Sequence, residues 1–483
     1  MNAVRKAELI PYIPFDRASA VPFYVQIYNG FLAAIVSGRL RPGQRLPSSR
    51  ALATELCVSR IPVLNAFDQL LHEGYLEGRV GSGTYVRARR VHLNASGTTS
   101  RTALDCAAVG RNGAGGSRAH GVGPFSNVPA FDGFPHKTWA RLIRRHACRP
   151  SVDLFARGDP AGYAPLREAV GAYVSSARGV DCDAGQVLIV SGPQMGLRIC
   201  ALAFATAGSA LCVEEPCRPS ARAALDIPQN ELIPVSVDGH GIDVCALERL
   251  GGDATAVYVT PDHQDPLGVA MTASRRQALL SWADEGRRWI VEGDYDSAFR
   301  YSTRPLGALQ GIDTAERVIY VGTFSNVLFP DIRLGYLVVP RSLLSTFIRI
   351  RESLDGCSPT LYQRVLTDFL GGGHFARHVR RMQTLYSARR QVLVERLHEH
   401  LGDVVTLGTA DAGLHVVAFL PDGVDDQNVV RKAAGVGLFP QALSTFYVTG
   451  RAPSGLLLGF GGANESTLET EVRTLGDVIR RML

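Results

Sequence analysis

The spacing of apolar positions divides the start of the chain into short helices and a hairpin. Residues 22–37 carry apolar side chains at helical spacing and are followed by a glycine, a common stop signal. Two shorter helices are expected over 49–56 and 60–72, each directly after a serine that can cap it. Residues 75–86 have the pattern of two short strands around a glycine-rich turn. This order predicts a winged helix-turn-helix domain over residues 1–88.

Downstream, the pattern changes twice. Residues 89–126 are rich in Gly, Ser, Ala and Arg, which predicts a flexible linker. Residues 127–483 are expected to form one α/β domain with a mostly parallel sheet and helices on both faces. The last part, from about 345 to 483, has the pattern of a small α+β lobe that closes with a helix at 465–483. The sheet is predicted from six strand-like apolar runs that alternate with helical segments, at 187–190, 210–213, 256–259, 289–291, 318–321 and 334–339.

Charge is concentrated in the predicted winged helix. Residues 1–90 contain 12 basic and 6 acidic residues, whereas the remainder contains 39 of each, so the whole formal charge of +6 belongs to the first part. This distribution favours a domain that binds a polyanion, joined to a neutral body.

Composition excludes two classes of protein. With 46% hydrophobic and 20% charged residues over 483 positions, the chain is a folded globular protein rather than a disordered tail. The longest uncharged apolar stretch, 199–213, is shorter than the roughly 20 residues that a membrane span needs, so we expect no membrane segment. The nine cysteines include no C-x-x-C pair and no apolar signal segment is evident, which favours a cytoplasmic protein with reduced thiols and no metal site.

Four short motifs in the N-terminal domain resemble the GntR-type winged helix of bacterial transcription factors. They are LPSSRALA at 46–53, VSR at 58–60, EGYL at 73–76 and GSGTYV at 81–86. The resemblance implies a recognition helix in the major groove of double-stranded operator DNA, with arginines and a glycine wing holding phosphates and the minor groove. The implied DNA-binding residues are Arg50, Ser59, Arg60, Arg79 and Gly83, together with Asn65, which is able to read adenine. The recognition helix departs from the family at Pro62, Leu64 and Asn65, where Thr and Arg are usual.

The body resembles a fold-type I aminotransferase. The matching motifs are GDPAGYAPLR at 158–167, SGPQ at 191–194, DYDS at 294–297 and TFSNVLFPDIRLGY at 323–336. A GntR-type winged helix joined to this fold is typical of the MocR-like subfamily of GntR regulators. The resemblance implies a homodimer formed through the aminotransferase-like domain.

The parts that pyridoxal phosphate chemistry requires are largely missing. The family's Schiff-base lysine corresponds to Asn326, and an amide cannot form an aldimine. The family's pyridine carboxylate corresponds to Gly293. Glu292 and Asp294 are adjacent carboxylates that would have to compensate, but neighbouring residues on a strand point to opposite faces. The three lysines of the chain offer no obvious substitute, and they are Lys6, Lys137 and Lys432. Two further pocket positions differ as well, with Arg218 in place of a stacking tyrosine and Asp265 in place of an aromatic residue.

The phosphate cup, by contrast, matches the family. Tyr163 corresponds to the residue that reaches the neighbouring subunit's site, and Tyr295 to the one that bonds the ring hydroxyl. The implied phosphate-binding residues are Ser191, Gly192, Gln194, Thr323 and Arg333. These residues either bind a phosphate-bearing or anionic ligand or remain as structural relics.

Three hypotheses follow. The first is a sequence-specific transcriptional regulator whose aminotransferase-like body is not catalytic, holds no covalent cofactor, binds pyridoxal phosphate at most weakly and senses a small-molecule effector. The second is an active pyridoxal phosphate enzyme with a DNA-binding appendage. The third is a scaffold with an empty pocket. Asn326 and Gly293 favour the first over the second, because each removes a separate part of the catalytic apparatus.

Overall fold

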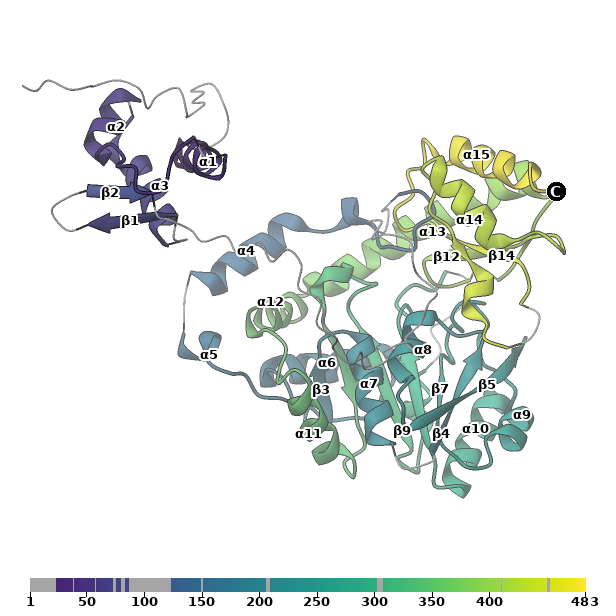
Figure 1. Cartoon of the computed structure of the whole chain (residues 1–483). Helices are drawn as coiled ribbons and strands as arrows, with labels where there is room; N and C mark the ends of the chain where they lie inside the picture. The colour runs from purple at the N-terminus through teal and green to yellow at the C-terminus, as the bar shows by residue number, and fades with distance from the viewer. Residues whose placement is uncertain are drawn as a thin grey trace, which may run out of the picture. The chain divides into compact units, whose positions relative to one another are not determined.

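The computed structural model divides the chain into two compact units, Met1–Ala114 and Gly115–Leu483 (Figure 1). We call residues 23–86 the head and residues 123–483 the body, and describe each by itself. The residues that the structure describes are 23–37, 39–56, 58–72, 75–79, 83–86, 123–148, 151–205, 209–301, 307–409, 411–449 and 452–483.

The head is a winged helix-turn-helix, as predicted. Its elements are α1 (Phe23–Val36), α2 (Ser49–Glu55), α3 (Arg60–His72), β1 (Leu76–Arg79) and β2 (Gly83–Val86). The Ser48 hydroxyl caps α2 by accepting a hydrogen bond from the Ala51 amide at 3.2 Å. The rings of Phe31 and Phe67 meet edge to face, with centroids 5.4 Å apart, in a core that holds α1 against α3. The two strands pair antiparallel as the wing.

The body contains an eight-stranded sheet with the order β3-β10-β9-β8-β7-β4-β5-β6. Its strands are parallel except β10, which is antiparallel to both neighbours, and β6, which is antiparallel to β5. The six predicted strands are all present. The bounds are β3 (Val187–Val190), β4 (Ser209–Glu215), β5 (Asn230–Asp238), β6 (Gly241–Ile242), β7 (Ala254–Val259), β8 (Trp289–Asp294), β9 (Val318–Thr323) and β10 (Gly335–Val338).

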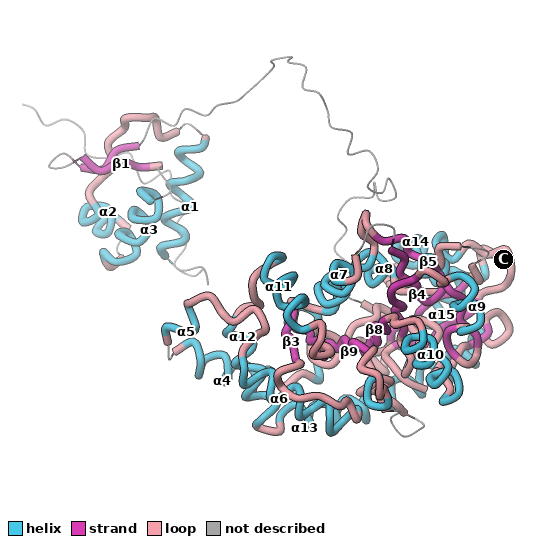
Figure 2. The backbone as a smooth tube through the Cα atoms, turned by 90° about the horizontal axis from the view of Figure 1, so that it is seen from below, coloured by secondary structure: helices cyan, strands magenta, loops and turns pink. Residues whose placement is uncertain are grey.

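Helices cover both faces of this sheet, as Figure 2 shows from below. Alternate residues of β3 pack on opposite sides: Val187 and Ile189 join one core, and Leu188 and Val190 join the other. A strand that is buried on both faces requires an uninterrupted run of apolar residues, and for this reason these strands can be predicted from the sequence. The helices of the body are α4 (His136–Ala147), α5 (Val152–Phe155), α6 (Ala164–Arg178), α7 (Pro193–Ala203), α8 (Pro219–Leu225), α9 (Val244–Leu250), α10 (Ala273–Glu285), α11 (Leu344–Leu354), α12 (Thr360–Gly371), α13 (His374–Leu401), α14 (Asp426–Gly435) and α15 (Leu468–Arg480).

A small lobe is built on a second, antiparallel sheet with the order β11-β12-β14-β13. Its strands are β11 (Thr406–Leu407), β12 (His415–Phe419), β13 (Gln441–Ala442) and β14 (Gly455–Gly459). The long helix α13 and the helix α14 pack against it, and α15 packs against these two helices (Figure 1). The closing helix is therefore where the sequence predicts it, with bounds a few residues shorter.

The body begins earlier than predicted. Residues 89–122 of the predicted linker lie outside the described residues, but 123–126 are ordered against the small lobe. Phe125 is 1% exposed, and its carbonyl oxygen accepts a hydrogen bond from the Gly459 amide at 2.9 Å. The Phe439 amide donates to the carbonyl of Pro124, also at 2.9 Å. A buried aromatic side chain with paired backbone belongs to a domain rather than to a linker, so the body starts by residue 123.

Within the described part of the chain, we find no helix that combines the length and the apolar composition required to cross a bilayer.

Candidate functional site

Helix α3 of the head has one buried and one open face. Val63, Ala66 and Phe67 face the core of the head. On the other side Asn65 is exposed, and Ile61 is 67% exposed, an unusual position for a large apolar residue. The outer face of α3 is therefore open to contact a partner with both a polar and an apolar side chain.

The predicted arginines lie at the beginnings of α2 and α3. Arg60 is exposed at the start of α3, directly after the exposed Ser59, and its Nε donates a hydrogen bond to the Ser49 hydroxyl at 3.0 Å. Arg50 is exposed in the first turn of α2. The Arg60–Ser49 bond holds the first turns of the two helices together, so both guanidinium groups are presented from adjoining helix ends.

A further arginine, which sequence reasoning missed, lies beside the wing. Gly83 has φ = +115° and pairs with Arg79 across the hairpin. A Cβ atom at Gly83 would lie 3.1 Å from Nε of Arg45, which is exposed and whose backbone forms a bridge with Tyr85. Arg45 therefore lies against the wing, although it precedes the first motif; the only signal for it was the basic excess of the domain. The side chain of Arg79 lies outside the described parts.

In the body, the predicted pocket residues gather where the strands of the large sheet end. Arg218, Asp265, Tyr295 and Asn326 follow β4, β7, β8 and β9 respectively. The carboxyl ends of parallel strands form one edge of the sheet, the usual place for ligands in such folds. The structure thus brings these four residues to the same edge.

Arg218 and Asp265 neutralise each other at this edge. Nη2 of Arg218 donates to Oδ1 of Asp265 at 2.7 Å, and Nε donates to Oδ2, so the pair is bidentate. Burial alone would lower the pKa of Arg218, but the Asp265 carboxylate outweighs it and raises the pKa above its ordinary value. The guanidinium also lies 5.7 Å from the ring centroid of Tyr295 and 5.8 Å from that of Phe446. The two departures from the family pattern are therefore partners, and they place an ion pair where a flat aromatic ring would stack.

The position of the missing pyridine carboxylate is closed by an aromatic side chain. A Cβ atom at Gly293 would lie 2.7 Å from the hydroxyl oxygen of Tyr258, which is 7% exposed. The neighbouring acids are used elsewhere: Glu292 accepts from the Leu309 amide at 2.7 Å, and Asp294 accepts from Arg178 Nε at 2.9 Å. Neither acid therefore stands in for a carboxylate at position 293.

The hydroxyl group of Tyr295 forms its hydrogen bond with another residue of the body. Its hydroxyl donates to the backbone carbonyl of His263 at 2.7 Å. The Nδ1 atom of His263 lies 3.1 Å from both carboxylate oxygens of Asp296. Burial would lower the pKa of His263, but the Asp296 carboxylate raises it above the ordinary value. Tyr295 is thus held by a buried network that the sequence analysis did not identify.

Asn326 is half-buried, and its side chain makes no hydrogen bond to any residue in the described ranges. Thr323, three residues earlier, accepts a hydrogen bond from the Ser325 amide at 3.1 Å. Lys137 on α4 and Lys432 on α14 are exposed, and neither belongs to the strand ends that form the pocket. Lys6 lies outside the described residues.

The phosphate cup is only partly available. Gly192 has φ = +96° and opens α7, but the next residue, Pro193, has no backbone N–H to offer an anion. The Ser191 hydroxyl donates to Asp355 at 2.8 Å and accepts from Arg351 at 3.3 Å. Ser191 is therefore occupied by Asp355 and Arg351, which are themselves ion-paired with each other, and its hydroxyl is not free for a phosphate.

The remaining predicted cup residues are less constrained. Arg333 is exposed and makes no ion pair with any described carboxylate, and Gln194 lies in the first turn of α7. Tyr163 precedes α6, and Arg364 lies 5.2 Å from the centroid of its ring. An anion at this edge would find Arg333, Gln194 and the amides of α7, but not the Ser191 hydroxyl.

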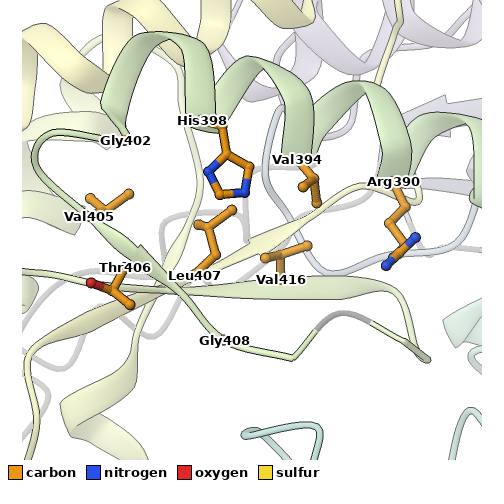
Figure 3. A pocket seen from close by; sticks show the side chains of 9 residues that line it. All are labelled: Arg390, Val394, His398, Gly402, Val405, Thr406, Leu407, Gly408 and Val416. Carbon is orange, nitrogen blue, oxygen red and sulfur yellow. The ribbon is translucent and has the colours of Figure 1, made fainter.

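Two cavities of the body differ in their relation to this edge. One, of about 580 Å³, has Arg218 in its wall and opens between α8 of the large lobe and α14 with residues 440–446 of the small lobe. The other, of about 470 Å³, lies between α13 and the strands β11 and β12, where His398 extends from the helix toward Leu407 and Arg390 extends from the same helix at the other end of the cavity (Figure 3). None of the predicted pocket residues lines the second cavity.

Comparisons with known proteins agree with both units. Residues 23–86 match the family model of bacterial regulatory proteins of the gntR family. The chain is 35% identical to a protein of Rhizobium meliloti described as a probable rhizopine catabolism regulatory protein, MocR, over 95% of this chain and 94% of that one. It is 31% identical to the pyridoxine biosynthesis transcriptional regulator PdxR of Corynebacterium glutamicum, over 92% and 93% of the two chains.

Among solved structures, a multiple substrate aminotransferase from Thermococcus profundus superimposes with a TM-score of 0.69 at 27% identity, covering 76% of this chain and 93% of that one. The body therefore has the fold-type I aminotransferase architecture. The chain belongs to the MocR-like subfamily of GntR transcriptional regulators, in which a GntR DNA-binding domain is joined to an aminotransferase-like domain.

Proposed function

We propose that this transcriptional regulator uses its aminotransferase-like body without transamination, as a dimerisation platform and as a receptor for a small anionic effector. The main observation in support of a body without transaminase activity is the Arg218–Asp265 ion pair, which lies at the same sheet edge as Asn326. The relatives described as regulators support the same interpretation.

The residues present do not fit covalently bound pyridoxal phosphate. An amine is required to form the aldimine, and Asn326 supplies an amide. A carboxylate is required at the pyridine nitrogen, and Gly293 has Tyr258 in the place of one. A guanidinium beside the ring would also oppose protonation of the pyridine nitrogen. Non-covalent, weak binding through the phosphate group is the most that we propose for this cofactor.

Support for an anionic effector comes from the part of the cup that is free. Arg333 is exposed and unpaired within the described parts, and the first turn of α7 follows Gly192. Separately, the cavity of about 580 Å³ that has Arg218 in its wall is lined by residues of both lobes, although neither Arg333 nor α7 lines it. A ligand that contacts both lobes is able to favour one arrangement of the lobes over another, which is what a sensor requires.

An absorption spectrum tests the absence of catalysis. We expect the purified protein, mixed with pyridoxal phosphate, to show no aldimine band, because no amine is placed to form one. The variant Asn326→Lys tests whether the amine alone is missing. A band in the wild-type protein that borohydride fixes to a body residue would contradict the proposal and support the enzyme hypothesis.

A phosphate titration tests the effector site separately. We expect inorganic phosphate and pyridoxal phosphate to raise the melting temperature of the body, and Arg333→Gln to remove the effect. Arg287→Gln is the matched control, because Arg287 is exposed on the loop after α10. If neither anion raised the melting temperature of the wild-type protein, the body would be a scaffold, and the sensing part of the proposal would fail while the non-catalytic part stood.

Dimerisation is supported by an apolar surface on α5. Val152 and Phe155 are 82% and 78% exposed, which is exceptional for such side chains in a folded chain. The segment is nevertheless fixed, because Arg364 of α12 donates to the Ser151 hydroxyl at 3.2 Å and lies 3.8 Å from Asp153. An ordered but uncovered apolar helix supports contact with a second copy of the chain.

Analytical ultracentrifugation tests whether α5 contributes to the dimer interface. The double variant Val152→Ser, Phe155→Ser should shift the protein toward monomer at micromolar concentration. The control Ile312→Ser, Val436→Ser removes apolar residues that are each 53% exposed elsewhere on the body and should leave the dimer intact. A wild-type protein that sediments as a monomer would contradict the dimer.

A further inference from the structure

A strongly basic surface covers α4 of the body. Lys137, Arg141 and Arg144 are exposed at spacings of four and three residues, so they lie on one side of the helix. The opposite side is buried through Trp139 and Leu142. The helix contains no acidic residue. Its outer face is therefore cationic throughout.

The beginning of α13 extends this surface. Arg377, Arg380 and Arg381 are exposed within its first two turns, and the first acidic residue of the helix is Glu395. Loss of solvent, and then the nearby guanidinium groups of Arg377 and Arg141, lower the pKa of His374 below its ordinary value. The two helices meet at Phe369 of α12, whose ring centroid lies 5.5 Å from that of Trp139 on α4 and 5.8 Å from that of His374 on α13. In Figures 1 and 2, α4 runs beside α12, and α13 begins just past the end of α12.

Nearby acids leave most of these charges uncompensated. Asp368 lies 3.2 Å from Arg145 and 2.9 Å from His146, and Asp132 lies 2.7 Å from Arg389. The side chains that make no ion pair with a described carboxylate are Lys137, Arg141, Arg144, Arg380 and Arg381. Because residues 91–483 carry equal numbers of basic and acidic side chains, these five charges are a local concentration rather than a property of the whole body.

We infer that this surface, which we call the α4/α13 face, is a second DNA-contacting surface that binds phosphates of the duplex in addition to the contacts of the head. The inference rests on the DNA-binding function of the family. Arginine suits phosphate because its planar guanidinium donates two parallel hydrogen bonds. Contacts of this kind add affinity without reading sequence.

The chemistry of the face favours nucleic acid over a protein partner. A stable protein interface needs buried apolar anchors at its centre. None of the large apolar side chains that are exposed in the described residues belongs to α4 or α13. A surface with five unpaired cations and no apolar anchor matches a uniformly anionic backbone.

The experiment measures binding of the full chain to a duplex of mixed sequence, about 40 base pairs long or four helical turns, as a function of salt. Arg50→Ala with Arg60→Ala weakens the head, and the residual affinity is compared with and without Lys137→Gln, Arg141→Gln and Arg144→Gln. We expect the α4 substitutions to weaken residual binding at least about tenfold at low salt and to reduce the slope of log K against log salt by about 2. Arg380→Gln with Arg381→Gln should act in the same direction.

The matched control removes three exposed charges elsewhere on the body, by Arg249→Gln, Arg431→Gln and Lys432→Gln. It has the same net charge as the α4 variant, so a general loss of attraction would lower both equally. Equal binding by the control and the α4 variant, or unchanged binding by the α4 variant with an unchanged melting temperature, would overturn the inference. Because the non-catalytic proposal is tested by absorption rather than by DNA binding, the two fail independently.

Discussion

The hydroxyl oxygen of Tyr258 occupies the space that a side chain at position 293 would need, 2.7 Å from where the Cβ atom would lie. The two positions are on neighbouring parallel strands, where Tyr258 is directly opposite Val291. Gly293 is two residues beyond Val291 and therefore presents the same face of the sheet. The absence of a carboxylate at 293 is thus coupled to the packing of a buried aromatic ring, so that restoring the carboxylate also requires a change at 258.

Gly293→Asp should therefore destabilise the body by about 1–3 kcal/mol, the usual result of overpacking a core. Tyr258→Phe should relieve only part of this loss, since ring carbons would still lie 2.9 and 3.1 Å from the new Cβ atom. Tyr258→Val should relieve more of it. Thermal unfolding of the single and double variants measures the coupling. If Gly293→Asp alone were as stable as the wild type, the packing argument would be wrong.

Because Arg218 and Asp265 form an ion pair, we expect that substitutions at these two positions do not change the free energy of unfolding additively. Arg218→Ala leaves the Asp265 carboxylate, 5% exposed, without its partner and should cost about 3–5 kcal/mol. The double variant Arg218→Tyr, Asp265→Phe replaces the pair by two aromatic residues and should be more stable than Arg218→Ala. Chemical denaturation of Arg218→Tyr, of Asp265→Phe and of the double variant completes a double-mutant cycle that gives the interaction energy. Additive losses would show that the two side chains do not depend on each other.

The fold was predictable where burial imposes a simple pattern. Strand β3 is buried on both faces and consists of four apolar residues, so it is recognisable from sequence. Strand β5 was missed because it has both buried and exposed positions and contains Pro234, which interrupts the strand signal. The start of the body was missed because a single residue, Phe125, anchors it within a segment whose composition is that of a linker.

The candidate site was predictable residue by residue but not as an arrangement. Arg218 and Asp265 were each recognisable as departures from the family pattern, yet they are 47 positions apart, and their pairing depends on the sheet order. The contact of Tyr258 with position 293 depends on strand register, which sequence spacing does not fix. The engagement of Ser191 by Arg351 and Asp355 likewise depends on a helix more than 150 residues further along the chain.

A buried carboxyl group gives a pH dependence. Oε2 of Glu214 accepts from the Thr260 hydroxyl at 2.6 Å, whereas Oε1 is buried with no hydrogen-bond partner in the described ranges. Burial raises the pKa of Glu214 to about 7, from 4.5. Below pH 4.5 both the folded and the unfolded chain hold this proton, and above pH 7 neither does. Between these values the folded state alone holds it, so the free energy of unfolding falls as the pH rises through this window, by up to roughly 3 kcal/mol.

Glu214→Gln should reduce this slope, because the amide keeps an oxygen acceptor and does not titrate. Part of the slope should remain, because burial also raises the pKa of Glu292 to about 7. Denaturant unfolding of the body at several pH values between 4.5 and 8 measures it. The exposed residue Glu248 provides the matched control through Glu248→Gln, which should leave the slope unchanged. A slope that Glu214→Gln fails to alter would contradict the assignment of a protonated Glu214.

Arg60 should be essential for specific DNA binding. Arg60→Ala removes a guanidinium at the start of α3, and we expect at least about a thirtyfold loss of affinity for an operator selected from random duplexes, or 2 kcal/mol. Ser49→Ala removes only the 3.0 Å hydrogen bond that positions Arg60 and should cost less. Fluorescence anisotropy measures both, and the melting temperature of the body should not change. Full affinity in Arg60→Ala would contradict the assignment of α3 as the recognition helix.

Ile61 should contribute sequence preference through a methyl group. It is 67% exposed on the face of α3 that also carries Asn65, and an apolar side chain in the major groove is suited to the C5-methyl group of thymine. Replacing thymines of a selected operator by deoxyuridine, one at a time, removes only that methyl. We expect one replacement to weaken wild-type binding about fivefold, or roughly 1 kcal/mol, and to leave Ile61→Ser unaffected. Each deoxyuridine removes one methyl group and nothing else from the DNA. If Ile61→Ser lost affinity at the same deoxyuridine as the wild type, that methyl group would be contacted by a side chain other than Ile61, and the prediction would be wrong.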